Sequence, residues 1–164
     1  SIVRFERMEW AIEKLTELGV SRIIPLIAQR SEKHLVQASV KRKERWRKIA
    51  RESAQQSRRN SIPEICDPMS IHECIAEMPD ALRLLLSEQE RTQSLRESLL
   101  ATGMQATQPG AIYAAIGPEG GWTSAELAIF AESGWRSVSL GPRILRTETA
   151  AIAVASVCIT WWSR

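Results

Sequence analysis

The segment LGPRILRTETAAIAVASVCITWW, residues 140–162, joins a polar loop to a helix-like run of small apolar residues. Its Thr-Glu-Thr triplet (residues 147–149) supplies a helix cap from either threonine, and a carboxylate that suits the positive end of the helix dipole. Arg143 and Arg146 do not fit this account, because cations are unfavourable at a helix N-terminus. We therefore expect both arginines to have acidic or anionic partners.

The helical half of this segment is rich in side chains that allow close approach of another backbone. Two interpretations remain open from composition alone, a helix in the core of the domain and a helix packed against a second subunit. The small residues are Ala150, Ala151, Ala153, Ala155 and Ser156.

A second glycine-containing loop precedes it in IGPEGGWTSAEL, residues 116–127. Gly117, Gly120 and Gly121 leave no side chain between the backbone and a ligand, but the spacing is neither that of a Walker A loop nor that of a Rossmann motif. A tight turn between a strand and a helix explains the glycines equally well. Glu119 is not explained by turn preferences. Thr123 with Glu126 forms the pattern of a capping box, which predicts a helix start.

Strand-like and helix-like runs alternate along the chain, which predicts one α/β domain over residues 1–164 with a mostly parallel sheet. In such sheets, sites lie beyond the carboxyl ends of the strands, which selects the loops 87–91, 117–122 and 141–147. The expected strands are 22–27, 61–65, 82–87, 111–117 and 136–141, and the expected helices are Phe5–Leu18 ended by Gly19, 39–57 capped by Ser39, 70–78, 93–100 and 123–133.

Composition excludes several classes of protein. Hydrophobic residues make up 44% and charged residues 25%, as in soluble globular domains. The sequence has no apolar run of about 18 residues and no signal-peptide pattern, so we expect a cytoplasmic protein without a membrane partner. Three cysteines and two histidines stand apart from one another, so we expect free thiols and no metal site. The first residue is not Met, which suggests a fragment of a longer protein.

Positive charge is concentrated in residues 41–59, which contain nine Lys or Arg and two Asp or Glu. The rest of the chain has a net charge of −4. A helix here that buries Trp46, Ile49, Ala50 and Ser53 turns its basic side chains outward. Such a face is either simply solvated or a surface that follows a nucleic-acid backbone, and both interpretations remain open.

With these motifs in view, the sequence resembles the SPOUT-class methyltransferases that methylate N3 of a uridine in bacterial 16S ribosomal RNA. The resemblance implies an α/β knot, in which the C-terminal segment passes through a loop, and a homodimer with the last helix in its interface. It rests on KLTELGV (residues 14–20), RWRKIARESAQQSRRNSIPEI (45–65), IGPEGGWTSAEL and LGPRILRTETAA.

The sequence departs from the family in three respects. The family's N-terminal β-barrel, which binds RNA, has no counterpart in these residues. Trp122 stands where an aromatic such as Phe is common, and Arg58 stands where the family often has Gly.

The resemblance also implies roles for individual residues. Arg146 is expected to stabilise the charge on the uridine, with Glu148 or Glu119 accepting its proton or orienting Arg146. S-adenosylmethionine is expected to contact Leu86, Ser87, Glu88, Ile116, Gly117, Pro118, Glu119, Gly120, Gly121, Leu140, Gly141, Ile144, Leu145, Arg146 and Thr149. The 16S rRNA of the small ribosomal subunit is expected to contact Arg30, Lys41, Arg42, Arg45, Lys48, Arg58 and Arg59. Methylation of another rRNA or tRNA nucleotide, and a non-catalytic role in RNA binding or ribosome assembly, remain alternatives.

Overall fold

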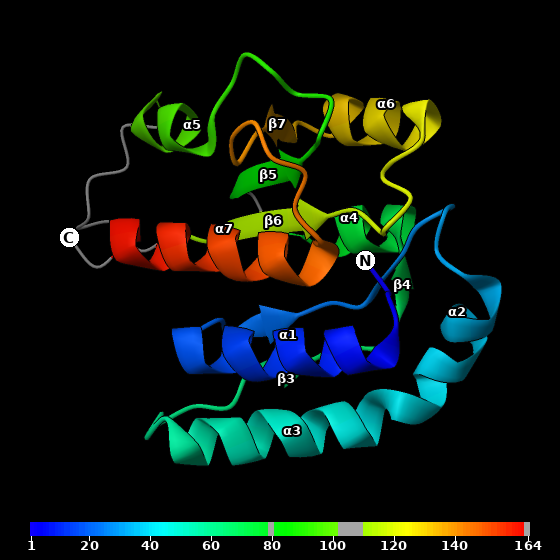
Figure 1. Ribbon diagram of the computed structural model, residues 1–164, viewed down its shortest axis with the longest axis vertical. Coiled ribbons are helices and arrows are strands. Elements are labelled where there is room, and N and C mark those ends of the chain that lie inside the picture. The colour runs from blue at the N-terminus through cyan, green and yellow to red at the C-terminus, as the bar shows by residue number, and fades with distance from the viewer. Residues whose placement is uncertain (79–80, 102–109, 163–164) are drawn as a thin grey trace.

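The computed structural model describes residues 1–78, 81–101 and 110–162, which form a layered α/β domain (Figure 1). The strand pairs of the described residues are parallel, which agrees with the predicted mostly parallel sheet. The elements are α1 (Phe5–Leu18), β1 (Arg22–Ile23), β2 (Leu26–Ile27), α2 (Lys33–Ser39), the 3-10 turn η1 (Val40–Arg42), α3 (Lys43–Gln56), β3 (Glu64–Ile65), β4 (Met69–Ser70), α4 (Ile71–Glu77), β5 (Leu82–Leu86), α5 (Leu95–Ala101), β6 (Ile112–Ile116), α6 (Ser124–Glu132), β7 (Arg136–Val138) and α7 (Thr147–Trp162).

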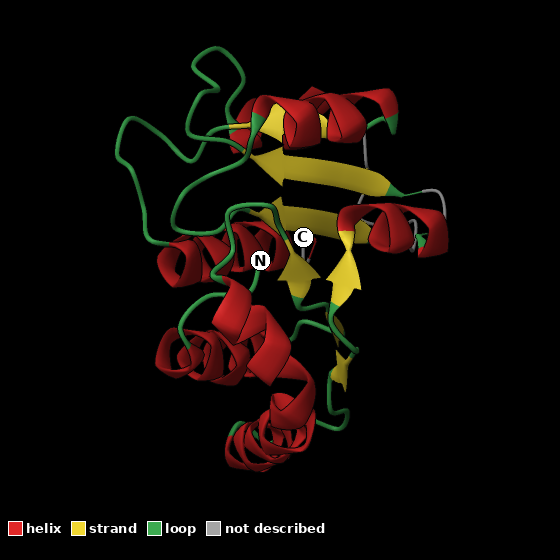
Figure 2. Ribbon diagram, turned by 90° about the vertical axis from the view of Figure 1, so that its right-hand side faces the viewer, coloured by secondary structure: helices red, strands yellow, loops and turns green. Residues whose placement is uncertain are grey.

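The main sheet has the order β6-β5-β7, with β5 in the centre. In register, Leu86 lies opposite Ile116 on one side and Val138 on the other, so the three strands end together. Long loops extend beyond these ends at one edge of the sheet (Figure 2). This arrangement places the three predicted loops side by side.

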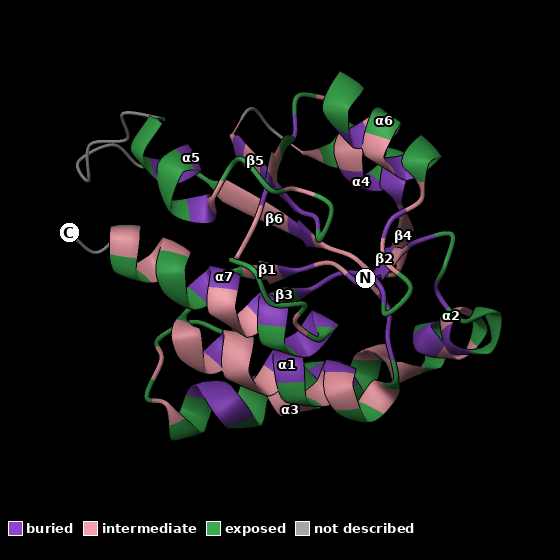
Figure 3. Cartoon of the chain, turned by 45° about the horizontal axis from the view of Figure 1, so that its top comes forward, coloured by how far each residue is buried: buried purple, intermediate pink, exposed green. Residues whose placement is uncertain are grey.

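Helices cover the sheet in layers. Helix α7 runs beside α1, and α3 packs on the other side of α1 at the base of the molecule (Figure 1). Buried residues lie between these layers, whereas the outer faces are exposed (Figure 3). Trp46, Ala50 and Ser53 of α3 are buried and Ile49 is half-buried, which confirms the predicted inner face of the basic helix.

Several predicted elements need correction. Pro25 divides the run 22–27 into β1 and β2, which pair with different partners, β3 and β4. The predicted cap at Ser39 is wrong, because Ser39 is the last residue of α2 and does not stand at the start of an α-helix. The Ser39 backbone is itself helical, and its buried hydroxyl donates to the Val36 carbonyl oxygen at 2.6 Å. Helix α2 was not predicted. Its buried face consists of Leu35 and Ser39, four residues apart, which is a weak sequence signal for a helix.

Two other predicted helix-end signals are confirmed. Gly19 ends α1 with a φ of 104°, as predicted. The Thr123 side chain accepts a hydrogen bond from the Glu126 amide, and the Glu126 carboxylate accepts one from the Thr123 amide, so the predicted capping box is confirmed. In the described residues, no helix is long and apolar enough to cross a membrane.

The thiols of Cys66, Cys74 and Cys158 are free, as expected. Burial raises the pKa of Cys74 and of Cys158 to about 11, so both remain protonated at neutral pH. Within the described ranges, no group of three His, Cys, Asp or Glu side chains is placed to hold a metal ion.

Helix α3 ends in a Schellman motif that contains an unfavourable residue. The Arg58 amide donates to the Gln55 carbonyl and the Arg59 amide donates to the Ala54 carbonyl, the pattern that requires a left-handed residue at Arg58. Arg58 has a φ of 55°, and it alone among the described non-glycine residues has a positive φ. A side chain in this region is strained, which explains why glycine suits the position.

We therefore expect Arg58→Gly to raise the free energy of unfolding by about 1 kcal/mol. Urea denaturation followed by circular dichroism measures this change. The matched control is Arg51→Gly, which places glycine inside α3 and should lower the free energy of unfolding by about 1 kcal/mol. A destabilising effect of Arg58→Gly would contradict the assignment of strain.

Candidate functional site

The loops that follow β5, β6 and β7 enclose a pocket of about 400 Å³, closed on one side by the start of α7. We call it the three-loop pocket. Parallel strands present their carboxyl ends at one edge of the sheet, which is why loops some 30 residues apart in sequence meet there.

Most of the residues expected to contact a cofactor line this pocket. Gly120 and Thr149 do not. The lining residues from the expected set are Leu86, Ser87, Glu88, Ile116, Gly117, Pro118, Glu119, Gly121, Leu140, Gly141, Ile144, Leu145 and Arg146. The other lining residues are Arg7, Gln89, Trp122, Leu127, Val138, Ser139, Arg143, Thr147 and Ala150. Of these, Gln89, Trp122, Arg143 and Thr147 lie in the three predicted loops, whereas no signal in the sequence predicted Arg7 here.

The two exceptions have structural explanations. The exposed Gly120 carbonyl oxygen accepts a hydrogen bond of 2.7 Å from Arg30, and a Cβ on Gly120 would lie 3.2 Å from the Arg30 Cβ. Thr149 is exposed, and the buried Thr147 lines the pocket instead. The Thr147 hydroxyl donates to the Gly117 carbonyl oxygen at 2.9 Å. The predicted cap by Thr147 or Thr149 is wrong, because α7 already begins at Thr147.

The glycine loop packs tightly against its neighbours. Gly121 has a φ of 67°, and a Cβ there would lie 2.8 Å from the Glu88 carboxylate. A Cβ on Gly117 would lie 3.3 Å from the Trp122 indole. Glycine at these two positions therefore allows the loop after β6 to pack against its own aromatic residue and against the loop after β5.

Trp122 connects two walls of the pocket. Its buried indole Nε1 donates to the Leu86 carbonyl oxygen at 3.0 Å, which ties the glycine loop to the end of β5. The ring packs edge-to-face on Phe130, with centroids 5.0 Å apart, and Phe130 packs in the same way on Trp135. This aromatic row fixes the loop to α6.

Charged side chains are distributed unevenly around the pocket. Arg143 and Arg146 are exposed and line it, and in the described part of the chain neither forms an ion pair. The described residues therefore do not supply the expected acidic partner, and both guanidinium groups are accessible to an anionic ligand. Glu119 and Glu148 instead both contact Arg7 of α1.

The three candidate catalytic residues are only partly brought together. Arg146 and Glu119 line the three-loop pocket. Glu148 is buried and lines a second, largely apolar cavity of about 720 Å³ between α1, β6 and α7. The buried carboxylate lies behind the wall of the pocket rather than in it.

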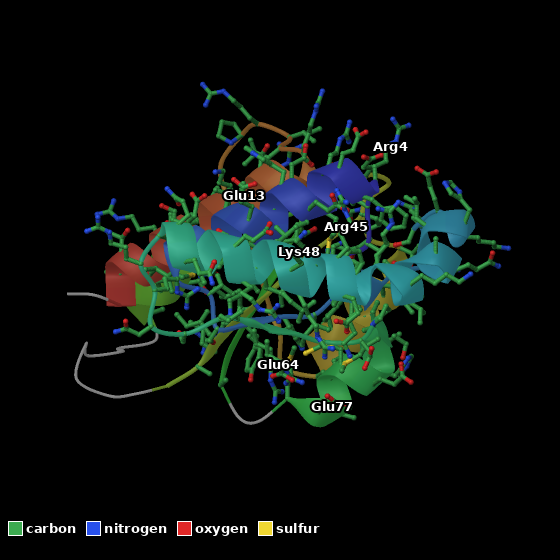
Figure 4. The ribbon with its side chains drawn as sticks, turned by 90° about the horizontal axis from the view of Figure 1, so that it is seen from below. Arg4, Glu13, Arg45, Lys48, Glu64 and Glu77 are labelled. Atoms are coloured by element: carbon green, nitrogen blue, oxygen red, sulfur yellow. The ribbon has the colours of Figure 1, made fainter. Side chains whose placement is uncertain are left out.

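The basic segment lies on the outer face of α3, where Figure 4 shows Arg45 and Lys48. Several of its cations are engaged within the chain. Arg45 forms a two-pronged ion pair with Glu9, at 2.6 and 2.8 Å, and Arg42 lies over the Phe5 ring. Arg59 donates to carbonyl oxygens at the end of α1, including that of Thr16 at 2.7 Å.

Other cations of the segment remain available. In the described residues, Lys41, Arg51 and Arg58 are exposed and form no ion pair. Lys48 is exposed and lies 3.7 Å from Glu52. Arg51 was not among the residues expected to bind RNA, although the same charge run contains it.

Comparison with known proteins matches nearly the whole chain to one family. A family model described as an RNA methyltransferase domain matches residues 1–159. The ribosomal RNA small subunit methyltransferase E of Bacillus subtilis is 37% identical over 153 residues, 92% of this chain and 60% of that protein. The protein of the same name from Synechocystis is 35% identical, over 91% of this chain and 48% of its own length.

Solved structures agree with the sequence matches. The methyltransferase E of Neisseria gonorrhoeae, crystallised with bound S-adenosyl methionine, superposes with a TM-score of 0.84 at 37% identity, covering 99% of this chain and 64% of that one. A Legionella pneumophila methyltransferase in complex with the same cofactor gives 0.83 at 35% identity, covering 95% and 62%. The chain spans 60% of the length of the Bacillus subtilis relative and 48% of the length of the Synechocystis relative. With nearly its whole length matched, the chain belongs to the RNA methyltransferase domain family.

Proposed function

We propose that the protein containing this chain is an S-adenosylmethionine-dependent methyltransferase that methylates N3 of a uridine in the 16S rRNA of the small ribosomal subunit. The observation that carries the proposal is the three-loop pocket, which combines backbone from two glycine turns with an arginine that has no acidic partner in the described residues. Relatives named as small-subunit rRNA methyltransferases, and structures that contain the cofactor, support it.

The pocket fits S-adenosylmethionine in size and character. Its volume of about 400 Å³ lies within the range for small-molecule sites, about 300–1,000 Å³. Leu86, Ile116, Leu140 and Leu145 provide an apolar lining for an adenine ring. Glu88 offers an acceptor for hydroxyl or ammonium groups at the rim. When bound, the cofactor supplies an electrophilic methyl group on a sulfonium.

The chain's own residues would activate the acceptor. Uridine N3 carries a proton that must leave, and the resulting negative charge spreads onto the flanking carbonyl oxygens. Arg146, exposed at the pocket, would stabilise that charge as the donors of an oxyanion hole do. Glu119, which also lines the pocket, is better placed to accept the proton than the buried Glu148.

The outer face of α3 would hold RNA phosphates, and Arg30 would extend this surface toward the glycine loop. Exposed cations without an internal partner are the strongest contributors, because a phosphate does not have to compete with a carboxylate for them. Among the expected residues these are Lys41 and Arg58, joined by Arg51. Arg45 and Arg59 would contribute less.

RNA affinity should then fall steeply with salt, with a slope of about 0.7–0.9 per phosphate contacted. We expect Lys41→Ala to reduce the slope by about one and Arg45→Ala to reduce it less, since Glu9 already holds Arg45. Fluorescence anisotropy with a 16S rRNA fragment at 50–200 mM salt measures the slopes. An affinity that does not change with salt would refute the RNA-binding surface.

A homodimer, a knotted C-terminal segment and a cytoplasmic location belong to the same proposal. The exposed face of α7 carries small or β-branched residues, including Ser156 and Val157, and the exposed Trp10 stands on the neighbouring helix α1. Such a surface suits close packing of a second copy. Light scattering of the complete protein, with Val157→Arg as the disrupting variant, tests the dimer.

Two measurements on the complete protein test the function. Calorimetry should show binding of S-adenosylmethionine at one site per chain, which a non-catalytic RNA-binding module has no reason to show. Mapping of methylated nucleotides in rRNA from a deletion strain should show the loss of one N3-methyluridine in 16S rRNA. Loss of a methyl group at a different rRNA or tRNA nucleotide would favour the alternative substrate instead.

A further inference from the structure

Arg7 contacts two carboxylates that are both far from it in the sequence, Glu119 and Glu148. It lies in the first turn of α1, and its guanidinium contacts Glu119 through Nη1 and faces Glu148, with 3.7 Å between Nε and Glu148 Oε1. Glu119 belongs to the glycine loop after β6, and Glu148 belongs to the first turn of α7. The same guanidinium therefore spans two walls of the three-loop pocket.

The burial of Glu148 explains why a cation is needed at this point. The Glu148 side chain is only 7% exposed, and its Oε2 has no hydrogen-bond partner in the described part of the chain. A buried carboxylate is costly unless a cation neutralises it. Among the residues that the structure describes, Arg7 is the cation within ion-pair distance of Glu148, so the buried carboxylate anchors its guanidinium.

The other end of the contact lies at the surface of the pocket. Glu119 is 38% exposed and Arg7 is 28% exposed, so an isolated ion pair between them would contribute little. Anchored by Glu148, however, the planar guanidinium offers Glu119 a fixed position, which a flexible lysine would not. The glycine loop carries Glu119 and also lines the pocket through Gly117, Pro118 and Gly121.

We propose that Arg7 is a positioning residue of the methyl-transfer site, which fixes the glycine loop relative to the start of α7 through its contacts with Glu119 and Glu148. The expected effect of Arg7 on kcat rests on the proposed function, whereas its effect on the position of the glycine loop does not. It gives the buried Glu148 a task different from proton transfer.

The test compares Arg7→Met and Arg7→Lys with Arg4→Met in the complete protein. Arg4 precedes α1 with an exposed side chain, so its replacement removes the same charge from the same helix end. Hydrogen exchange of the peptide containing residues 117–121, without cofactor, should be at least threefold faster in Arg7→Met and unchanged in Arg4→Met. With cofactor and rRNA, kcat of Arg7→Met should fall at least tenfold, whereas KM for RNA changes less than twofold.

Arg7→Lys keeps a positive charge near Glu148 and should fold even if Arg7→Met does not. Its kcat is expected to lie between those of Arg7→Met and the unaltered protein, with faster exchange of the same loop. Unchanged exchange in Arg7→Lys and Arg7→Met would overturn the inference, even if kcat fell, because Arg7 would then act on the substrate directly. If the unaltered protein neither binds the cofactor nor transfers methyl groups, the proposed function fails, and the exchange result still decides the role of Arg7.

Discussion

Arg146→Ala is expected to lower kcat for methyl transfer by about 100- to 1,000-fold while S-adenosylmethionine still binds. Removal of one charge-stabilising donor from an active site typically has an effect of this size, about 3–4 kcal/mol. Arg146 is exposed at the three-loop pocket, and in the described residues no carboxylate pairs with it. Its charge is therefore available to a substrate that becomes negative as N3 loses its proton.

The control for this variant lies three residues earlier in the same loop. Arg143 is also exposed and also lines the pocket, so Arg143→Ala removes an equal charge from the same region. We expect it to change kcat less than tenfold. Single-turnover assays with the complete protein, together with calorimetry for the cofactor, separate transfer from binding. Near-normal turnover of Arg146→Ala would show that the charge is stabilised elsewhere.

Trp122→Ala is expected to lower the free energy of unfolding by about 3–5 kcal/mol, as truncation of buried aromatic residues does. Trp122 is buried, packs on Phe130 and donates to the Leu86 carbonyl oxygen. The variant leaves that oxygen without its donor and removes the contact between the glycine loop and the end of β5. Chemical denaturation measures the stability, and calorimetry should show weaker cofactor binding as well.

Phenylalanine variants separate the hydrogen bond from the packing. Trp122→Phe keeps an aromatic ring against Phe130 but loses the donor to Leu86. Trp135→Phe alters the other end of the aromatic row, where the indole Nε1 is buried and has no hydrogen-bond partner in the described residues. We expect Trp122→Phe to weaken cofactor binding more than Trp135→Phe does. Equal effects would mean that packing alone maintains the pocket.

Local signals in the sequence predicted much of the fold. The capping box of Thr123 and Glu126 and the left-handed Gly19 depend on residues a few positions apart, so both were visible in the sequence. The alternation of strands and helices predicted the parallel sheet, and the rule for strand ends then selected the three loops. Helix α2 was missed because its buried pair, Leu35 and Ser39, spans a single turn.

Contacts between residues far apart in the sequence could not be predicted from the sequence. The sequence does not distinguish Arg45 and Arg59 from Lys41, because all three belong to one charge run. In the structure Glu9 binds Arg45, and carbonyl groups at the end of α1 bind Arg59, from 36 to 43 residues away. Arg7 reaches Glu119 across 112 positions, and no periodicity predicts such a contact. The number of cations was visible in the sequence, but their availability depends on the tertiary structure.

The shared end point of β5, β6 and β7 also has a thermodynamic consequence. The pocket is lined by the loops that follow all three strands, so it exists only when the whole sheet has formed. A ligand that binds there binds the native state and not the unfolded chain. At a concentration 100 times its Kd, such a ligand adds about 2.7 kcal/mol to the free energy of unfolding. Occupancy of the site is thus linked to the persistence of the fold.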